Sequence, residues 1–179
     1  MRIGSWSVAA LAALAMAVLG LSGAGAQQAK SQVFKSWALD CTTPKAAAGA
    51  TTAPKTVCLI HHEVRKQDDQ TKVVLIATAR YLGADHKPFM IFRLPPIANL
   101  QKGFAFQVDK NQAYRAKITS CVEKFCTSAF ELKDDLLKQF RSGTQLAISF
   151  IVNPQGDMKE TIPLAGFGAA LDALQKTGS

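Results

Sequence analysis

The sequence predicts an all-β domain, an antiparallel β-sandwich that carries two short helices and is braced by disulfides. Turn residues separate short apolar or alternating runs about every ten positions, a spacing that is typical of antiparallel sheets. Strand and helix patterns do not alternate along the chain, so a parallel sheet is not expected. The 179 residues are enough for one domain with a real core.

Residues 1–26 have the pattern of a secretory signal peptide. Val8–Leu21 is uncharged and mostly apolar, and Ala24–Ala26 supplies the small residues that signal peptidase requires. A membrane anchor is the alternative, but these 14 residues would span only about 21 Å as a helix, against a hydrocarbon core of about 30 Å. We expect a mature start near Gln27, or slightly later near Ala29. No integral membrane segment is expected after the signal peptide is removed.

The mature part divides into a polar segment 27–36, expected to be flexible, and one β-sandwich domain over 37–176. Within the domain, Thr42–Thr56 is low in complexity and made of small and polar residues, so it is expected to be an exposed loop. The expected strands are Trp37–Cys41, Val57–Val64, Val73–Leu82, Phe89–Leu94, Phe104–Val108, Tyr114–Ile118, Cys126–Glu131, Thr144–Val152 and Met158–Ile162. They fit an immunoglobulin-like or jelly-roll-like sandwich, with an open barrel as the alternative arrangement.

Two segments change to helical spacing. Their apolar residues are Leu136, Leu137 and Phe140 in the first, and Leu164, Phe167, Leu171 and Leu174 in the second. For the first helix, Asp134 is the expected N-cap and Gly143 the expected left-handed residue at the C-terminus. Gly166–Gly168 is interpreted as the entry to the second helix rather than as a phosphate-binding loop.

The four cysteines all lie in the mature part, which fits an oxidising compartment such as the periplasm or the outside of the cell. Four cysteines allow three pairings. We favour Cys41–Cys58 and Cys121–Cys126 because each pair closes a local loop. A redox pair at Cys121 and Cys126 is the alternative, but thioredoxin-type dithiols have two intervening residues and sit beside a βαβ pattern, whereas four residues separate these cysteines.

No catalytic, cofactor-binding or metal-binding constellation is recognised. Zinc knuckles need paired short cysteine spacings, and Cys41 and Cys58 have sixteen residues between them. His61 and His62 point to opposite faces of a strand, so the two cannot ligate one ion together. His86 lies in a turn, and a meeting of His61 or His62 with His86 or Glu63 in space is left open by the sequence. The adjacent carboxylate pairs at 68–69 and 134–135 are explained by a turn and a helix start.

The formal net charge is +8, and removal of Arg2 with the signal peptide leaves +7. The basic residues are scattered, and Arg65–Lys66 is the longest run of adjacent basic residues. Nucleic-acid binders show clustered Lys and Arg on a recognisable module, so nucleic acid is not an expected partner. Two interpretations remain: a solvated basic surface, or attraction to anionic envelope lipids or host-surface polyanions.

Several residues form an ordered set that resembles the invasion-associated locus B family of alphaproteobacterial envelope proteins. The set consists of the signal peptide, Trp37, Cys41, Cys58, Leu94–Pro95, Gly103, Asp109, the Cys121 and Cys126 pair, and Leu164–Phe167. The resemblance covers about 33–176. Phe125 is a departure, since glycine is expected before the second cysteine of the pair.

The resemblance implies an exported, all-β, non-enzymatic domain whose founding members are associated with bacterial entry into host cells. It supplies no active-site residues. Our leading hypothesis is therefore a periplasmic or surface-associated interaction protein whose partner is an envelope or host-surface protein, with Thr42–Thr56 as the most accessible binding segment.

Two alternatives belong to other classes. The first is a small-ligand or envelope-lipid binder with a pocket between the sheets lined by Phe104, Phe106 and Phe150. The second is an enzyme, which would require polar groups that converge in a cleft, for instance around His62 or His86. The positions of these side chains in the fold separate the three hypotheses.

Overall fold

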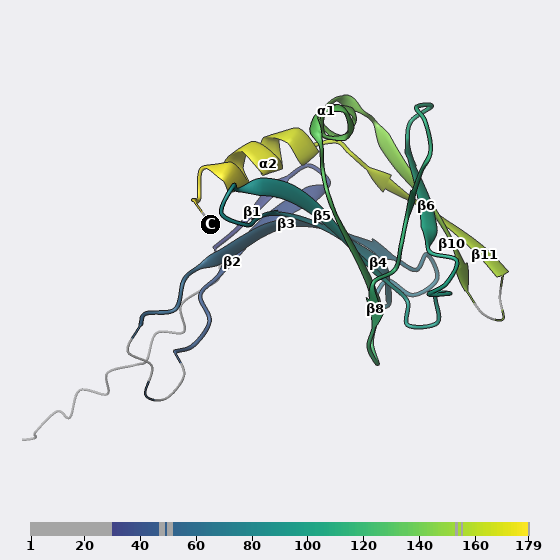
Figure 1. Ribbon diagram of the computed structural model, residues 1–179, viewed down its shortest axis with the longest axis horizontal. Coiled ribbons are helices and arrows are strands. Elements are labelled where there is room, and N and C mark those ends of the chain that lie inside the picture. Colours follow the sequence, from purple (N-terminus) through teal and green to yellow (C-terminus); the bar gives the residue numbers. More distant parts are fainter. Residues whose placement is uncertain (1–29, 47–48, 50–51, 153, 155, 179) are drawn as a thin grey trace, which may run out of the picture.

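The computed structural model describes residues 30–46, 49, 52–152, 154 and 156–178 (Figure 1). The expected signal peptide, 1–26, lies outside the described residues. Among the residues that are described, no helix is both long enough and apolar enough to cross a membrane.

The described chain folds into two antiparallel sheets, which confirms the all-β expectation. Sheet A has the strand order β1-β2-β3-β4-β5-β9-β8, and sheet B has the order β11-β10-β6-β7. The strands of sheet A are β1 (Lys30–Phe34), β2 (Trp37–Thr42), β3 (Val57–Arg65), β4 (Val73–Leu82), β5 (Lys87–Leu94), β9 (Cys126–Glu131) and β8 (Ser120–Cys121). Those of sheet B are β11 (Gly156–Pro163), β10 (Gln145–Val152), β6 (Phe104–Val108) and β7 (Tyr114–Ala116). The two helices are α1 (Asp134–Ser142) and α2 (Phe167–Gln175).

Sheet A curves beneath both α2 and sheet B, which cover different parts of the same face (Figure 1). Trp37 of β2 packs edge-on against Phe167 of α2, with ring centroids 4.9 Å apart. On the same face, Phe92 of β5 packs edge-on against Phe104 of sheet B at 5.3 Å. The core therefore has two parts, one under α2 and one between the sheets.

The described part of the expected flexible segment 27–36 is ordered by strand pairing. Lys30–Phe34 forms β1 and pairs antiparallel with β2, in register from Lys30 opposite Cys41 to Phe34 opposite Trp37. A two-residue turn joins the strands, with Lys35 at φ 53°. Phe34 packs against the core, and this contact, together with strand pairing, orders a segment whose composition is polar.

The organisation around the second cysteine pair differs from the sequence expectation. The run Tyr114–Ile118 is not one strand beside Cys126–Glu131. Tyr114–Ala116 pairs with β6 in sheet B, and the chain then crosses to sheet A, where Ser120–Cys121 pairs with β9. Ile118 is buried at this crossing. Its apolar side chain therefore serves the core at the crossing, although in the sequence it suggested a longer strand.

The ends of α1 also differ from expectation. Its N-cap is Lys133, without a side-chain hydrogen bond, so Asp134 lies in the first turn instead of capping it. Gly143 has φ −74° and is extended, not left-handed. Glycine is required there for space, because a Cβ would approach Val108 Cγ1 to 2.4 Å.

The entry to α2 agrees with the sequence. Gly166 is its N-cap, in the left-handed region at φ 93°, which favours glycine. A Cβ at Gly166 would also collide with the carbonyl of Phe34. The helix entry therefore lies directly against the β1–β2 turn.

Candidate functional site

The two disulfides are structural braces at opposite parts of sheet A. The structure joins Cys41 to Cys58 and Cys121 to Cys126, the pairs favoured by the loop-closure argument. In both pairs the cysteines lie directly opposite each other on antiparallel neighbours. No described cysteine is free. The cysteines fix strand pairing, and none of them offers a thiol nucleophile.

The histidines lie apart, as strand alternation predicts for His61 and His62. His61 Nδ1 lies 3.3 Å from the Asp40 carboxylate on the outer face of sheet A. His62 is on the inner face, where Nδ1 lies 2.6 Å from the Ser36 carbonyl and the ring is 5.9 Å from that of Trp37. His86 occupies the β4–β5 turn at φ 47°. Within the described residues, no group of three or more His, Cys, Asp or Glu side chains can hold a metal ion.

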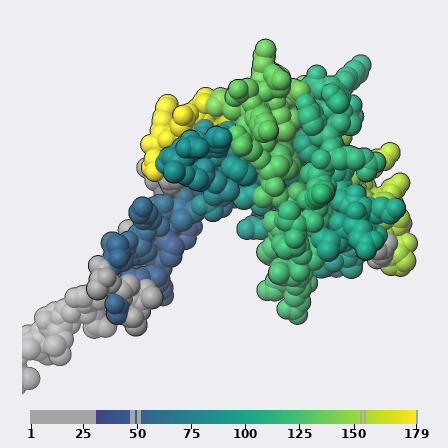
Figure 2. Space-filling model, in the orientation of Figure 1, coloured from purple at the N-terminus to yellow at the C-terminus, as the bar shows by residue number. Residues whose placement is uncertain are grey.

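The Thr42–Thr56 segment is only partly described, since 47–48 and 50–51 lie outside the described residues. At its base, the hydroxyls of Thr43 and Thr56 are 2.8 Å apart, directly beyond the Cys41–Cys58 disulfide. The β2–β3 hairpin that carries this segment extends away from the rest of the molecule (Figure 2, blue).

The pocket expected between Phe104, Phe106 and Phe150 does not exist as such. These side chains are only 2–3% exposed. Phe106 stacks on Phe130 with ring centroids 4.9 Å apart, and Phe104 packs against Phe92. The three rings fill the space between the sheets, so the sequence identified core residues correctly, but the rings themselves occupy the place of the cavity expected there.

A hollow lies on the outer face of sheet B, and we call it the basic groove. One row of side chains crosses all four strands: Lys159 on β11, Ser149 on β10, Ala105 on β6 and Arg115 on β7. Neighbouring strands are about 4.8 Å apart, so the backbones at the two cationic ends are about 14 Å apart. Small residues therefore form the floor, and a cation stands on each side.

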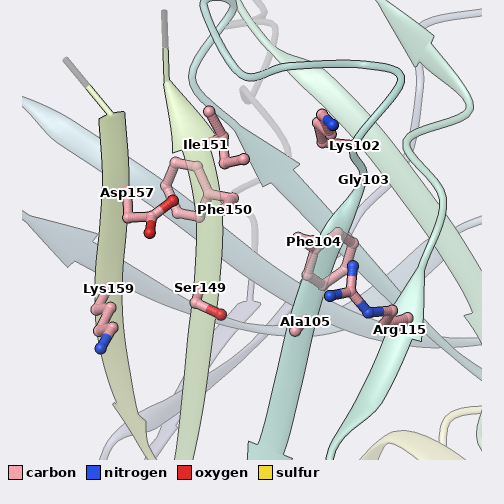
Figure 3. A pocket seen from close by; sticks show the side chains of 10 residues that line it. All are labelled: Lys102, Gly103, Phe104, Ala105, Arg115, Ser149, Phe150, Ile151, Asp157 and Lys159. Carbon is pink, nitrogen blue, oxygen red and sulfur yellow. The ribbon is translucent and has the colours of Figure 1, made fainter.

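The basic groove has a volume of about 430 Å³ (Figure 3). Lys102 lies at one end of it, and Asp157 lies on β11 beside Lys159 (Figure 3). Lys102, Arg115 and Lys159 are exposed, and none of them forms an ion pair with a described residue. With one carboxylate and three cations, the groove has a formal charge of +2 and suits an anionic group.

The β10 strand that forms the groove floor is held in register by Asp109. Its carboxylate accepts hydrogen bonds from the N–H groups of Thr144, at 3.0 Å, and Gln145, at 2.9 Å. These bonds lower the pKa of Asp109 below its ordinary value. Asp109 itself has φ 49°, a conformation that aspartate tolerates better than most residues. The end of β6 is thereby tied to the start of β10.

A second hollow, the side cleft, lies where the edge of sheet B faces the β3–β4 turn. Its volume is about 890 Å³. Its apolar lining consists of Val73, Val74, Pro95, Ile97, Val152 and Met158, and its polar lining of Arg65, Lys66, Gln67, Lys72, Lys159 and Glu160. Burial raises the pKa of Glu160, which forms no ion pair with a described residue. The hollow between the sheets therefore lies at their open side, away from the aromatic core.

The fold and its surface define a disulfide-braced β-sandwich protein with an open basic groove. Residues 37–175 match the family model described as Invasion associated locus B (IalB) protein. The chain belongs to this family, as the ordered set of sequence motifs indicates.

Relatives of known name agree with this assignment. An invasion protein B homolog of Brucella abortus strain 2308 is 20% identical over 152 residues, which cover 84% of this chain and 82% of that protein. The homolog from biovar 1 strain 9-941 of the same species matches equally well. A crystal structure of invasion associated protein b from Bartonella henselae superposes with a TM-score of 0.68 at 20% identity, covering 83% of this chain and 97% of that one. This likeness confirms the fold.

Sequence reasoning missed the basic groove because its residues come from four strands that are far apart in sequence. Ser149 and Ala105 become neighbours only through the β6–β10 register. One signal was available. Small or polar residues occupy the outward positions of both strands except at Ile151, between apolar residues that face the core.

Proposed function

We propose that this protein is exported and acts as a non-enzymatic interaction protein of the cell envelope, which holds an anionic group of its partner in the basic groove. Membership of the IalB family supports an interaction role, since its relatives are named as invasion proteins. The N-terminal sequence pattern and the two disulfides support export into an oxidising compartment. The partner is an envelope or host-surface protein.

The single observation that best supports this binding site is the row of four side chains across sheet B, formed by Lys159, Ser149, Ala105 and Arg115. Cations without carboxylate partners keep their full attraction for an incoming anion, whereas the paired cations of the β3–β4 turn are already partly neutralised. A floor of small side chains lets the anion approach the sheet between the two cationic ends. Exposed charges are screened by salt, so binding at the groove should weaken as ionic strength rises.

The test is a crosslinking pull-down from intact cells with the tagged protein. The groove variant replaces Lys102, Arg115 and Lys159 with Gln. The matched control replaces Lys110, Lys138 and Lys176 with Gln, which removes the same charge from exposed positions outside the groove. We expect the control to capture the partner as well as the wild type, and the groove variant to capture several-fold less. Equal capture by both variants would reject the groove as the binding site.

Shortening the Thr42–Thr56 segment tests the other candidate surface in the same assay. The Cys41–Cys58 disulfide closes its base, and none of its described residues belongs to the core, so the fold should survive the deletion. Loss of capture with the shortened segment, but not with the groove variant, would move the binding site to this hairpin.

The side cleft is the specific observation in favour of a second candidate function, small-ligand or lipid binding. Its volume of about 890 Å³ lies in the range of natural ligand sites, and much of its lining is apolar. Native mass spectrometry of the protein purified from its own cells tests this function. A bound small molecule that is lost on Met158→Trp, which fills the cleft, would support it, and an unliganded mass would count against it.

A further inference from the structure

Exposed aliphatic side chains gather at one end of the molecule. The described residues include five large hydrophobic side chains that are substantially exposed: Val33 (71%), Val73 (40%), Ile97 (50%), Leu100 (47%) and Val122 (56%). Val33 lies on β1. The other four lie on the segments 65–73, 95–102 and 121–126, which we call the loop end; Val73, the first residue of β4, ends the first of them. Single exposed hydrophobic residues are ordinary, but a cluster of them on one end is not.

Contacts place these connections side by side. The N–H of Asn99 donates to the carbonyl of Ile151 at 2.8 Å, and Ala98 forms a β-bridge with Val152, so 95–102 lies against the end of β10. Cys126 Sγ lies 3.7 Å from the Pro96 carbonyl, which brings the β8–β9 hairpin to the same segment.

Val73 and Ile97 both line the side cleft, which brings the β3–β4 turn to the same end. In Figure 1 the β8 hairpin and the segment before β6 lie on the same lower side of the sandwich, and in Figure 2 the hairpin (green) projects from the surface there. The four aliphatic side chains therefore belong to one end of the molecule.

Lysines accompany the aliphatic residues. Lys72 precedes Val73, Lys102 follows Leu100 by two residues, and Lys124 follows Val122 by two residues. Lys102 and Lys124 form no ion pair with a described residue, and the Lys72 ammonium lies 3.1 Å from the half-buried carboxylate of Asp69. Aliphatic residues interspersed with lysines are typical of surfaces that rest in the interface of an anionic bilayer.

We propose that the loop end docks on the surface of an anionic lipid bilayer. Val73, Ile97, Leu100 and Val122 enter the boundary between headgroups and acyl chains, while Lys72, Lys102 and Lys124 contact lipid phosphates. The substantially exposed hydrophobic side chains of the loop end lie on separate segments and are all aliphatic, whereas protein–protein anchor residues are enriched in Trp, Tyr and Arg. This inference goes beyond the proposed function, since the groove can bind an anionic partner with or without a membrane beneath the loop end.

Acidic residues limit the electrostatic part of this docking. Glu123 lies between Val122 and Lys124, and Asp157 lies beside the basic groove. Attachment therefore depends on both aliphatic insertion and lysine contacts, and added salt should weaken it without abolishing it.

The experiment is vesicle co-sedimentation with protein expressed from the full chain, so that the cell processes its N-terminus. The probes are vesicles of phosphatidylglycerol with phosphatidylethanolamine, and vesicles of phosphatidylcholine alone. We expect the wild type to sediment with the anionic vesicles. The double variant that carries Ile97→Glu and Leu100→Glu should bind these vesicles at least about tenfold more weakly. Val33→Glu is the control, because it places a glutamate at a still more exposed aliphatic residue, on β1 and away from the loop end, and it should bind like the wild type.

A second variant, Lys72→Gln with Lys124→Gln, leaves the basic groove and the aliphatic tips intact. It should lose several-fold affinity for anionic vesicles and bind phosphatidylcholine as the wild type does. Circular dichroism of each variant establishes that it is folded.

Three outcomes would overturn the proposal: no sedimentation of the wild type, an equal loss with Val33→Glu, or full binding by the Ile97 and Leu100 variant. Loss of partner capture by Arg115→Gln with Lys159→Gln, a groove variant that keeps Lys102, with unchanged vesicle binding would leave this inference standing. Loss of vesicle binding alone would leave the proposed function standing.

Discussion

The two ends of the sandwich differ in how far their apolar side chains are buried. At the end covered by α2, Trp37 and Phe167 are fully buried, and so are Ala170, Leu171 and Leu174 of the helix. At the loop end, the four aliphatic side chains remain 40–56% exposed. A disulfide lies toward each end, so covalent bracing does not explain the difference.

The difference shows that burial of apolar side chains stabilises the covered end more than the loop end. Burying an aliphatic or aromatic side chain stabilises a fold by about 1.5–3 kcal/mol, and the covered end obtains this from α2. The loop end lacks part of this stabilisation, because its aliphatic side chains remain exposed, as they do on binding surfaces. Substitutions at the covered end should therefore reduce stability, and substitutions at the loop end or in the groove should reduce binding.

The largest expected effect is at the covered end. Trp37→Ala removes a fully buried ring that packs on Phe167 and whose indole N–H donates to the Pro163 carbonyl at 3.0 Å. We expect the free energy of unfolding to fall by about 3–5 kcal/mol, measured by denaturant titration. Trp37→Phe keeps an aromatic ring and loses the hydrogen bond, so it should cost less. A loss under about 1 kcal/mol with Trp37→Ala would show that α2 is not a major source of stability.

The two disulfides allow the stability of the two parts of sheet A to be compared, since each part contains one of them. Cys41 and Cys58 are 17 positions apart and Cys121 and Cys126 are 5 apart. Chain-entropy estimates give about 3 kcal/mol for the longer loop and about 2 kcal/mol for the shorter one. Replacing each pair with Ala, one pair at a time, and measuring urea unfolding should reproduce this order. The reverse order would mean that native contacts around the β8–β9 hairpin outweigh loop closure.

Asp109, at the junction of β6 and β10, gives stability a defined pH dependence. Its pKa is lowered chiefly by the hydrogen bond from the Thr144 N–H and then by that from Gln145. The folded pKa lies below the unfolded value of about 3.9, so the ionised carboxylate contributes stability above that pH, and the contribution is lost as pH falls through the folded pKa. Asp109→Asn should lower Tm at pH 7, and the difference from the wild type should shrink below about pH 4.

Asp157→Asn is the control for that comparison, because the Asp157 carboxylate accepts no hydrogen bond from a described residue and forms no ion pair. Its Tm should follow that of the wild type across the same pH range. A constant Tm difference for Asp109→Asn at all pH values would show that the lost contribution is not electrostatic.

The smallest expected effect on stability is in the basic groove. Replacing Lys102, Arg115 and Lys159 with Gln removes exposed charges that have no ion-pair partner, so the free energy of unfolding should change by less than about 0.5 kcal/mol. Thermal unfolding of the same protein used in the pull-down measures this. A larger loss would mean that the groove cations hold sheet B together, and reduced capture would then reflect unfolding.

Local patterns predicted most of the strands, because burial on one face of a sheet imposes a period of two on the residues. Phe104, Phe106 and Val108 alternate in the sequence, and all three side chains face the core. The helix over 134–142 and the entry at Gly166 follow from equally local signals. The cysteine pairs also close short loops, so the favoured pairing needed no long-range knowledge.

The missed features depend on tertiary contacts. Lys30–Phe34 is ordered by pairing with β2, which its polar composition does not reveal. The crossing after Ala116 changes sheet without a proline or glycine to mark it. The basic groove requires the register of four strands, and the loop end requires knowledge of which turns meet. Periodicity alone determines neither.

The most direct test of the contrast between the two ends is site-specific photo-crosslinking in intact cells, with benzoylphenylalanine placed at position 100 or at position 33. Both positions are exposed and carry aliphatic residues, one at the loop end and one on β1 beside α2. If the loop end docks on the bilayer, the crosslinker at position 100 should capture lipid and the one at position 33 should not. Capture at position 33 without capture at position 100 would contradict the account.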